Sequence, residues 1–580
     1  MNNHKISLEQ VIFFSAFVLA LAIRIFQLGN LSLTELEANL ALQAHELAIG
    51  NAPVIGSHAG YISLTSMLFY FFGSSEFLAR FFPAIFGSFI VFFPYLLRRE
   101  IGRPSALILA FGFALDPGLV GISRQAGSMS LSVVTLLLAL GCLKIRSLRC
   151  AGFFAGIFLI SGPGTWSGVI ILSIVIIWTH LAERKNADDM ERKIFGGENE
   201  PGSKTVQSYR IFFYWMLGTA LVFSTALFQI PMGISSILSG VAEYFLGWVS
   251  YPKVYLQQMF AGLTVYELLP LFFGILGIGS GLLQEHKFDK FLSRCFIIAL
   301  FLALIYPERQ ITDLIWVIIP LWILAARQIV RISFIDHADI LPHLGVSIIS
   351  FVILVFTWIN SSNLVSSPIG GELDFQLRLA IIIGSILLIF IVVFLVSWGW
   401  SWRIAANGFL SGLLVILTGF TLSACWHSAG LSRNPAEEIW RPGTSIRDAD
   451  LLISSIQDLS EWSTGQPDAI DLIVIKDNSQ ALKWILRNYD KVDFAQALPV
   501  NSNVPLVITD STGVITLPLA YTGQDFIWEE EPAWDLFTIS NWINWAFYRR
   551  SPNEIETVIL WARSDIFPGV EPITLMDETD

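Results

Sequence analysis

The segment Leu31–Gly50, LSLTELEANLALQAHELAIG, is a short acidic stretch between two strongly apolar runs of the chain. It places Glu35, Glu37, His45 and Glu46 in a neighbourhood that otherwise consists mainly of Phe, Leu and Ile. Acidic side chains beside membrane-depth helices are costly unless they are used or solvated. The segment therefore predicts a functional loop at the edge of a membrane-embedded helical bundle.

The composition indicates that lipid is the solvent for most of the chain. Of 580 residues, 54% are hydrophobic and 14% are charged, whereas soluble globular proteins carry about 25% charged residues. Residues 430–580 hold 10 Lys and Arg against 24 Asp and Glu, a net charge of −14, and the rest holds 25 against 23, or +2. The sequence predicts a nearly neutral membrane body with an acidic soluble tail, which argues against nucleic acid as a partner.

Apolar runs long enough to cross a membrane recur along the body. A spanning helix needs ~20 apolar residues, fewer inside a bundle, and about thirteen runs qualify. The two on either side of Gly162-Pro163-Gly164 are short enough to be one broken helix, which leaves twelve open, and 62–72 reads as re-entrant or interfacial. Asp116-Pro117 predicts a break at the end of the third span. The runs are 10–28, 77–97, 105–121, 130–145, 151–161, 165–181, 211–230, 266–284, 292–306, 311–326, 342–359, 377–397 and 404–424.

Positive charge orients these spans. If the N-terminus is cytoplasmic, the loops on the cytoplasmic side carry most of the Lys and Arg, as the positive-inside rule requires. These loops include the polar segment Ala187–Lys204, predicted to be flexible. An odd number of spans then puts both Leu31–Gly50 and the C-terminal tail outside a plasma (cytoplasmic) membrane. Cations on the predicted cytoplasmic side include Arg98, Arg99, Arg103, Lys144, Arg146, Arg149, Arg184, Lys185, Lys287, Lys290, Arg294, Arg327, Arg331 and Arg403.

The predicted fold class is an all-α polytopic membrane bundle, residues 1–429, followed by a small extracytoplasmic α/β domain, residues 430–580. Strand-like and helix-like runs alternate in the tail, which is typical of an α/β domain. No phosphate-binding loop or dinucleotide motif occurs, so an ATP-driven or redox mechanism has no support. Cys142, Cys150, Cys295 and Cys425 lie in or beside apolar runs without metal-ligand spacing, which predicts buried thiols. The predicted strands are Ile470–Lys476, Pro505–Asp510 and Val558–Ala562, and the helices are Ala481–Tyr489 and Ala533–Tyr548.

Four motifs, in order, resemble one class of membrane enzymes. Leu33–Ala44, LTELEANLALQA, resembles the first outer loop of the GT-C glycosyltransferases, which include protein O-mannosyltransferases and the aminoarabinose transferase. That loop begins a helix of the form DEA-x-x-A-x-x-A. Ser75–Arg80 resembles the class motif G-x-S-E-x-x-x-R, Ser123-Arg124 the end of its third span, and Tyr306–Ala326 a late proline-containing span. The resemblance covers roughly residues 1–330.

The resemblance implies a general base in the first outer loop. In this class an acidic residue there takes the proton of an acceptor hydroxyl while the sugar leaves its polyprenyl-phosphate carrier with inversion. A positioned carboxylate accelerates such a step by ~10²–10⁴-fold. The candidates are Glu37 first and Glu35 second, and ~200° of helix rotation keeps the two from facing one site. Ser32-x-x-Glu35 and Thr34-x-x-Glu37 also match the capping-box pattern, so either carboxylate can equally mark the helix start.

Two positions depart from the class pattern. The usual Asp of the acidic pair falls on Leu36, and the acid that often follows the Ser-Arg motif is missing from Gln125–Ser128. An inactive relative therefore stays open. No resident cofactor or metal ligand set is indicated, and a divalent metal is left open.

The carrier phosphate needs cations at the outer face. Arginine suits phosphate because its planar fork can bind bidentately, although an arginine at a span end more often only reaches toward the interface. The phosphate-binding candidates are Arg309, Arg80, Arg124 and Arg378. His58 is the candidate on the acceptor side, and Asp313 is predicted to pair with Arg309 one helical turn away.

The sequence thus predicts an integral membrane glycosyltransferase that moves a hexosyl or pentosyl group from a polyprenyl-phosphate donor to a hydroxyl of a protein, lipid or envelope glycan, with membrane lipids around it. The alternative is a non-catalytic transporter or flippase-associated protein for lipid-linked sugars. Transporters commonly show repeated halves and charged sites at mid-membrane. The chain shows no repeat, and its charges lie near span ends, which favours the enzyme.

Overall fold

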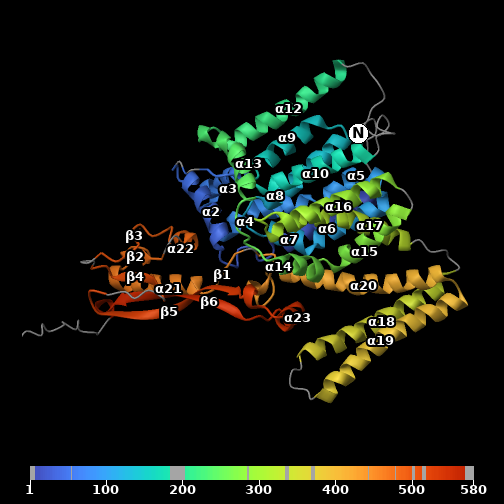
Figure 1. Cartoon of the computed structure of the whole chain (residues 1–580). Helices are drawn as coiled ribbons and strands as arrows, with labels where there is room; N and C mark the ends of the chain where they lie inside the picture. The colour runs from blue at the N-terminus through green and yellow to red at the C-terminus, as the bar shows by residue number, and fades with distance from the viewer. Residues whose placement is uncertain are drawn as a thin grey trace, which may run out of the picture.

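The structure is a computed structural model that describes residues 7–51, 53, 55–182, 203–283, 286–333, 339–366, 372–441, 443–476, 479–499, 503–511 and 517–567, with backbone only for 203–208 and 372–373. Most of the predicted loop Ala187–Lys204 lies outside these residues. The described chain forms a helical body and a tail domain built on one sheet, which lies against one end of the body (Figure 1).

Helices make up the whole body. They are α1 (Leu8–Ile25), α2 (Glu35–Ala48), α3 (Ala59–Phe72), α4 (Glu76–Phe89), α5 (Phe92–Ile101), α6 (Arg103–Leu115), α7 (Pro117–Ser123), α8 (Met129–Lys144), α9 (Leu148–Leu159), α10 (Gly164–Ala182), α12 (Ser203–Ser224), α13 (Ser235–Leu246), α14 (Leu256–Ala261), α15 (Leu268–Leu283), α16 (Lys287–Ile305), α17 (Ile315–Ser333), α18 (Ile340–Ser366), α19 (Glu372–Gly399) and α20 (Trp402–Ser428). Short turns of 3-10 or π helix, at Pro231–Ile234, Gly262–Tyr266 and Ile311–Leu314, join some of them.

Each predicted span falls on a helix, but fewer helices are suited to cross a membrane. Among the described residues, 7 helices are long and apolar enough, or 9 if each of two bent pairs counts as one span. The bends are 51° between α6 and α7 and 87° between α14 and α15. The prediction of about thirteen crossings therefore exceeds this count, because runs such as Met129–Lys144 and Leu148–Leu159 form shorter helices. The chain is a multi-pass membrane protein.

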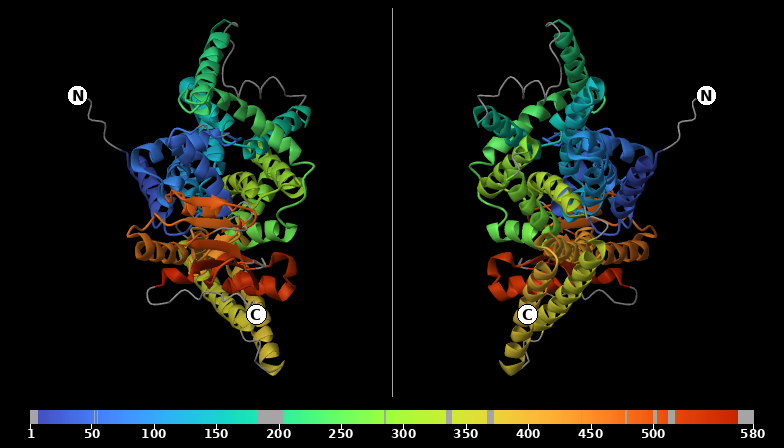
Figure 2. Two further views of the ribbon diagram at one scale, coloured as in Figure 1. Left: turned by 90° about the vertical axis from the view of Figure 1, so that its left-hand side faces the viewer. Right: turned by 90° about the vertical axis from the view of Figure 1, so that its right-hand side faces the viewer.

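The helices differ in how much of their surface is covered. α17 is the most covered of them, since 78% of the residues in its most apolar stretch are buried. In the corresponding stretch of α19, 6% of the residues are buried. α18 and α19 form a hairpin that extends beyond the body and the tail (Figure 2). Such an exposed apolar hairpin is what lipid contact requires. Three of the four cysteines are buried as predicted, but Cys150, at the start of α9, is exposed.

The tail is an α/β domain, as its alternating pattern predicts. Its six-stranded sheet has the order β1-β5-β6-β4-β2-β3. β2 is parallel to β3 and β4, and β6 is antiparallel to β4 and β5. The elements are β1 (Ser445–Ile446), α21 (Ala449–Thr464), β2 (Leu472–Ile475), α22 (Gln480–Ile485), β3 (Val492–Phe494), β4 (Leu506–Asp510), β5 (Tyr521–Pro532), α23 (Ile539–Tyr548) and β6 (Asn553–Arg563).

The tail and the segment Leu31–Gly50 share one hydrophobic core. Leu33, Ala38 and Ala41 of this segment belong to the same buried cluster as Leu482 and Trp484 of the tail. In sequence these groups lie more than 400 positions apart, yet α22 packs directly on α2. The tail is therefore docked on the acidic segment Leu31–Gly50.

The linker between body and tail also inserts into the bundle. Trp440 is fully buried, and its indole occupies space that Gly118 and Gly121 of α7 leave open. A Cβ at Gly118 would lie 2.8 Å from the Trp440 ring. The side-chain amide of Gln125 donates to the Trp440 carbonyl. Residues made late in the chain thus complete the packing of an early helix.

Candidate functional site

Glu37 and Arg80 meet in a buried ion pair. Thr34 caps α2 and forms the predicted capping box, in which the Thr34 N–H donates to Glu37 Oε2 at 3.1 Å and the Glu37 N–H donates to Thr34 Oγ1 at 3.4 Å. From α4, Arg80 Nε donates to Oε1 at 2.9 Å and Nη2 to Oε2 at 2.7 Å. The Ala126 N–H donates to Oε1 at 2.8 Å. Glu37 is 5% exposed and Arg80 3%.

Every donor and acceptor of this pair is occupied. The remaining N–H groups of Arg80 donate to the carbonyls of Leu28, Leu31 and Ser32. Both oxygens of Glu37 accept two hydrogen bonds each. Arg80 therefore has no N–H left for a lipid phosphate, and Glu37 offers no open lone pair to an acceptor hydroxyl.

The electrostatics of Glu37 agree with a structural role. Burial opposes its charged form, but the charge and hydrogen bonds of Arg80, with smaller contributions from Arg441 and the Ala126 N–H, lower the pKa of Glu37 to about 2. A carboxylate held so firmly as an anion is a poor proton acceptor near neutral pH. The pair fixes the segment Leu31–Gly50 against α4, and in this arrangement neither side chain is free to act as base or phosphate ligand.

Glu35 is used at the contact with the tail. Its carboxylate accepts from Ser479 Oγ at 2.5 Å, the Gln480 N–H at 2.6 Å and the Ala481 N–H at 3.1 Å. These groups belong to the first turn of α22, whose N–H groups have no partner within the helix. Glu35 therefore caps a helix of the tail. Leu36, between the two carboxylates, is 58% exposed.

Arg124 and Arg378 also have structural partners. Arg124 Nη1 donates to the carbonyls of Ile23, Arg24 and Phe26 at 2.7 to 3.0 Å, which satisfies the C-terminal end of α1. Arg378 lies on α19, in the projecting hairpin, and pairs with Asp374 at 3.0 Å. Of the four phosphate-binding candidates, Arg80, Arg124 and Arg378 thus each have their own structural partners.

Arg309 is the predicted cation that keeps unused donors. Its Nε donates to the Val254 carbonyl at 2.9 Å, and Nη1 lies 3.5 Å from the Leu304 carbonyl. Its Nη2 has no hydrogen-bond partner in the described part of the chain. Lys253, next to Val254, pairs with Glu308 at 2.9 Å and is largely exposed. Two cations therefore lie on neighbouring loops. Asp313 instead accepts from the Gln310 N–H at 2.8 Å, so the predicted pairing with Arg309 is wrong.

His58 lies in a polar cluster with Glu243, which the sequence did not single out. Its Nδ1 is 2.6 Å from Ser128 Oγ, and the preceding Ser57 donates to Glu243 Oε2 at 2.5 Å. Burial lowers the pKa of His58, and the nearby Glu243 carboxylate opposes this in part, so the imidazole is neutral at pH 7. Gly162 (φ +92°) makes this approach possible, because a Cβ there would lie 2.6 Å from His58 Nδ1.

Glu243 and Arg309 are linked through α13. Glu243 is exposed, and one helical turn further the Gly247 carbonyl accepts from the Glu308 N–H at 3.3 Å. The Tyr306 hydroxyl donates to the Tyr244 carbonyl at 3.0 Å, and the two rings stack at 4.9 Å. The C-terminal end of α13 thus carries an exposed carboxylate near a histidine and also adjoins a loop with an arginine. We call His58, Glu243, Lys253 and Arg309 the α13 cluster.

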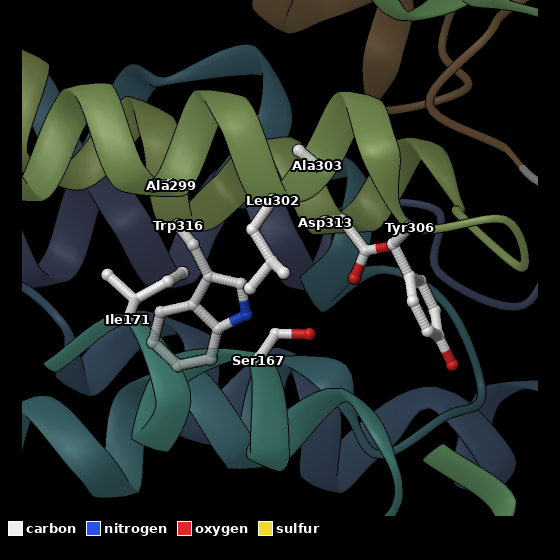
Figure 3. A pocket seen from close by; sticks show the side chains of 8 residues that line it. All are labelled: Ser167, Ile171, Ala299, Leu302, Ala303, Tyr306, Asp313 and Trp316. Atoms are coloured by element: carbon white, nitrogen blue, oxygen red, sulfur yellow. The ribbon is translucent and has the colours of Figure 1, made fainter. Parts of the chain in front are cut away.

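A narrow crevice is lined in part by Tyr306, the residue that stacks on Tyr244 of α13. Tyr306 and Asp313 stand at one end, and Ile171 and Trp316 at the other (Figure 3). Its volume of about 10 Å³ suits a single water molecule. Within the described residues, no three His, Cys, Asp or Glu side chains are placed to hold a metal ion.

Comparisons with known proteins place the fold. No family model matches the chain, and no curated protein matches it in sequence. The crystal structure of ArnT from Cupriavidus metallidurans bound to undecaprenyl phosphate is similar over 95% of this chain and 97% of its own, with a TM-score of 0.54 and 12% identity. ArnT in the apo state gives 0.53 at 13% identity. ArnT is an aminoarabinose transferase of the GT-C class. The chain has the GT-C fold.

A more distant likeness belongs to the same class. The archaeal oligosaccharyltransferase AglB from Archaeoglobus fulgidus, in complex with an inhibitory peptide and a dolichol-phosphate, gives a TM-score of 0.43 at 12% identity, over 87% of this chain and 69% of AglB. The predicted fold class, a GT-C-like helical bundle with a C-terminal α/β tail, is confirmed.

Proposed function

We propose that this chain is an integral membrane glycosyltransferase that moves a sugar from a polyprenyl-phosphate donor to a hydroxyl acceptor. The GT-C fold supports the proposal, and so does the undecaprenyl phosphate bound to ArnT. A fold by itself does not determine function. The observation that carries the proposal is Arg309, whose Nη2 has no partner among the residues that the structure describes and which lies near Lys253 on an adjacent loop.

In this proposal Arg309 binds the carrier phosphate. Its fixed Nε contact with the Val254 carbonyl orients the guanidinium, so its remaining N–H groups can engage phosphate oxygens as a fork. Lys253 adds charge at the same place once it exchanges Glu308 for the ligand. Stabilising the developing charge on the leaving phosphate is the main contribution that a cation makes to such a transfer.

Glu243 is the general base in place of Glu37 and Glu35. Its described hydrogen bond is with Ser57, which leaves lone pairs open on an exposed carboxylate. The acceptor hydroxyl gives its proton to Glu243 while its oxygen forms the new bond to the anomeric carbon. The bond from that carbon to the phosphate oxygen breaks, and polyprenyl phosphate leaves with the bonding electrons. Neutral His58 on the acceptor side can hydrogen-bond the incoming hydroxyl.

The proposal includes an orientation and an acceptor class. The N-terminus is placed in the cytoplasm and the tail outside, because the cations gather in the loops on one side. The acceptor is a protein, lipid or glycan hydroxyl on the outer side. A divalent metal has no described ligand cluster, and it is tested by adding Mg²⁺ or Mn²⁺ to the assay.

The test uses purified full-length protein in lipid nanodiscs. Binding of undecaprenyl phosphate is followed by native mass spectrometry, and transfer is followed with radiolabelled undecaprenyl-phosphate sugars and an envelope extract as acceptor. Arg309→Gln is expected to weaken lipid binding roughly tenfold or more. Arg378→Gln, the matched control on the outer hairpin, is expected to leave it unchanged.

The base is tested separately. Glu243→Gln is expected to bind the lipid normally and to lower transfer by ~10²-fold or more. Equal lipid binding by Arg309→Gln and the control would remove the phosphate assignment. Normal transfer by Glu243→Gln would remove the base. Lipid-linked sugar binding without transfer by the unaltered protein under every metal condition would make it a non-catalytic carrier-lipid protein instead.

A further inference from the structure

A second cavity lies where the tail meets the first outer loop. It has a volume of about 400 Å³. The loop 29–33 and the start of α4 form one wall, and α21 with residues 484–489 of the tail forms the other. It is distinct from the α13 cluster, and none of the residues assigned to transfer line it. Pockets between domains are common ligand sites.

The lining has the side-chain types that bind sugars. Planar amides and carboxylates, among them Asn30, Gln457 and Asn488, each present two hydrogen-bonding edges to paired hydroxyl groups. Tyr489 adds an aromatic ring with a polar hydroxyl to this lining. The ring of Trp484 is already covered by Arg487, whose guanidinium carbon lies 3.9 Å from its centroid. An apolar molecule of this size would leave these polar groups without partners.

Two aromatic residues carry the inference furthest. Trp484 is 1% exposed, and its Nε1 donates to Glu76 Oε1 at 2.8 Å, so its ring is fixed across the boundary between tail and body. Tyr489 is 9% exposed, and its hydroxyl is buried with no hydrogen-bond partner among the described residues. An unpaired buried hydroxyl destabilises the folded protein, so a ligand that pairs with it gains affinity.

The charge of the cavity selects among sugars. The lining includes three acids, Glu76, Asp450 and Asp468, together with Arg487. The N–H groups of Arg487 already donate to the Ser74 hydroxyl and carbonyl and the Trp484 carbonyl. An excess of carboxylates repels phosphate and other anions. The carrier lipid phosphate is therefore a poor ligand here, and a neutral or amine-bearing sugar fits.

We propose that this cavity is a binding site for a neutral or amine-bearing glycan, held jointly by the tail and the first outer loop. The ligand pairs with the Tyr489 hydroxyl and with Asp450 and Gln457 of α21. The site binds glycan whether or not the α13 cluster transfers sugar. In this proposal the tail takes part in recognising the glycan.

The experiment measures saccharide binding to full-length protein in nanodiscs by isothermal titration calorimetry. The probes are triacetylchitotriose, its deacetylated amine form, and maltotriose, with a sulfated trisaccharide as the anionic control. Binding of at least one neutral or amine probe and none of the sulfated one is expected. Tyr489→Phe and Asp450→Asn are each expected to weaken it roughly tenfold.

Asp458→Asn is the matched control, because Asp458 is an exposed acid on the same helix α21 and does not line the cavity. Tyr489→Phe removes one oxygen that has no partner, so its melting temperature should not fall, and a loss of affinity then reports contact with the ligand. Arg309→Gln should bind the saccharide normally, which separates this site from the proposed transfer site.

Three results would overturn the proposal. The first is no binding of any neutral or amine probe at millimolar concentration. The second is equal or tighter binding of the sulfated probe. The third is that Tyr489→Phe and Asp450→Asn bind the saccharide with the same affinity as the control Asp458→Asn.

Discussion

At the scale of single residues, Glu37 and Arg80 form a buried ion pair, and substituting only one of the two should destabilise the protein. Glu37→Gln leaves the Arg80 charge buried without its counter-ion, and breaking such a pair costs ~3–5 kcal/mol. The double variant Glu37→Gln/Arg80→Gln should recover part of that loss. Thermal unfolding in detergent measures both, with Glu46→Gln on the exposed side of α2 as the control.

The same pair predicts how stability depends on pH. The pKa of Glu37 is about 2 in the folded protein and 4.5 as the ordinary value. Its contribution to the free energy of unfolding is therefore complete above about pH 4.5 and is lost as the pH falls toward 2. The melting temperature of the unaltered protein should fall over this window more steeply than that of the double variant. Equal slopes would contradict the assignment.

Residue roles were the part of the site that the sequence predicted least. The motifs led to Glu37 and Arg80, and the capping box at Thr34 was correctly identified as one of two alternatives. The sequence did not show that Glu37 and Arg80 form an ion pair with each other, because they lie 43 positions apart on different helices. Glu243 belongs to no motif, and a single acid in the apolar segment 230–250 was the signal available for it.

At the scale of elements, one contact holds α22 on α2. Glu35 accepts from three donors in the first turn of α22, and a side-chain cap of this kind is typically worth ~1 kcal/mol. Glu35→Ala should therefore loosen the tail without unfolding the body. Hydrogen exchange should rise in residues 479–486, and Glu46→Ala should not change it. Unchanged exchange in Glu35→Ala would show that the apolar contacts of Trp484 suffice.

Helices were predicted well where hydrophobicity decides them and poorly where it does not. The break at Asp116-Pro117 is present, and Asp116 caps the next helix by accepting from the Leu119 N–H at 2.6 Å. It also accepts from Trp322 Nε1 at 2.5 Å, which ties the bend to α17. By contrast α13 and α14 are short helices, and no long apolar period marks them in the sequence.

At the scale of the whole molecule, the proposed orientation can be measured with two thiols. Native Cys150 is exposed beside cations assigned to the cytoplasmic side, and Ser463 is exposed in the tail. A membrane-impermeant maleimide applied to intact cells should label Ser463→Cys, in a background where Cys150 is Ser, and should leave native Cys150 unlabelled until the cells are opened. The opposite pattern would invert the protein and remove the outer-face proposal.

The domain arrangement is more connected than the sequence suggested. Composition separated a neutral body from an acidic tail, and that separation reflects where lipid and water lie. Composition carried no information on docking, because the contacts of Glu35 with Ser479 and of Trp484 with Glu76 join positions more than 400 residues apart.

The insertion of the Trp440 indole against α7 has a consequence for biosynthesis. During translation α7 emerges hundreds of residues before Trp440, whose indole fills the space beside Gly118 and Gly121. Until then the nascent bundle carries an unfilled seam, and closing a loop of that length is slow compared with local helix formation. A ribosome stalled before codon 440 should therefore leave a membrane-inserted intermediate that chaperones and proteases can recognise as unfinished.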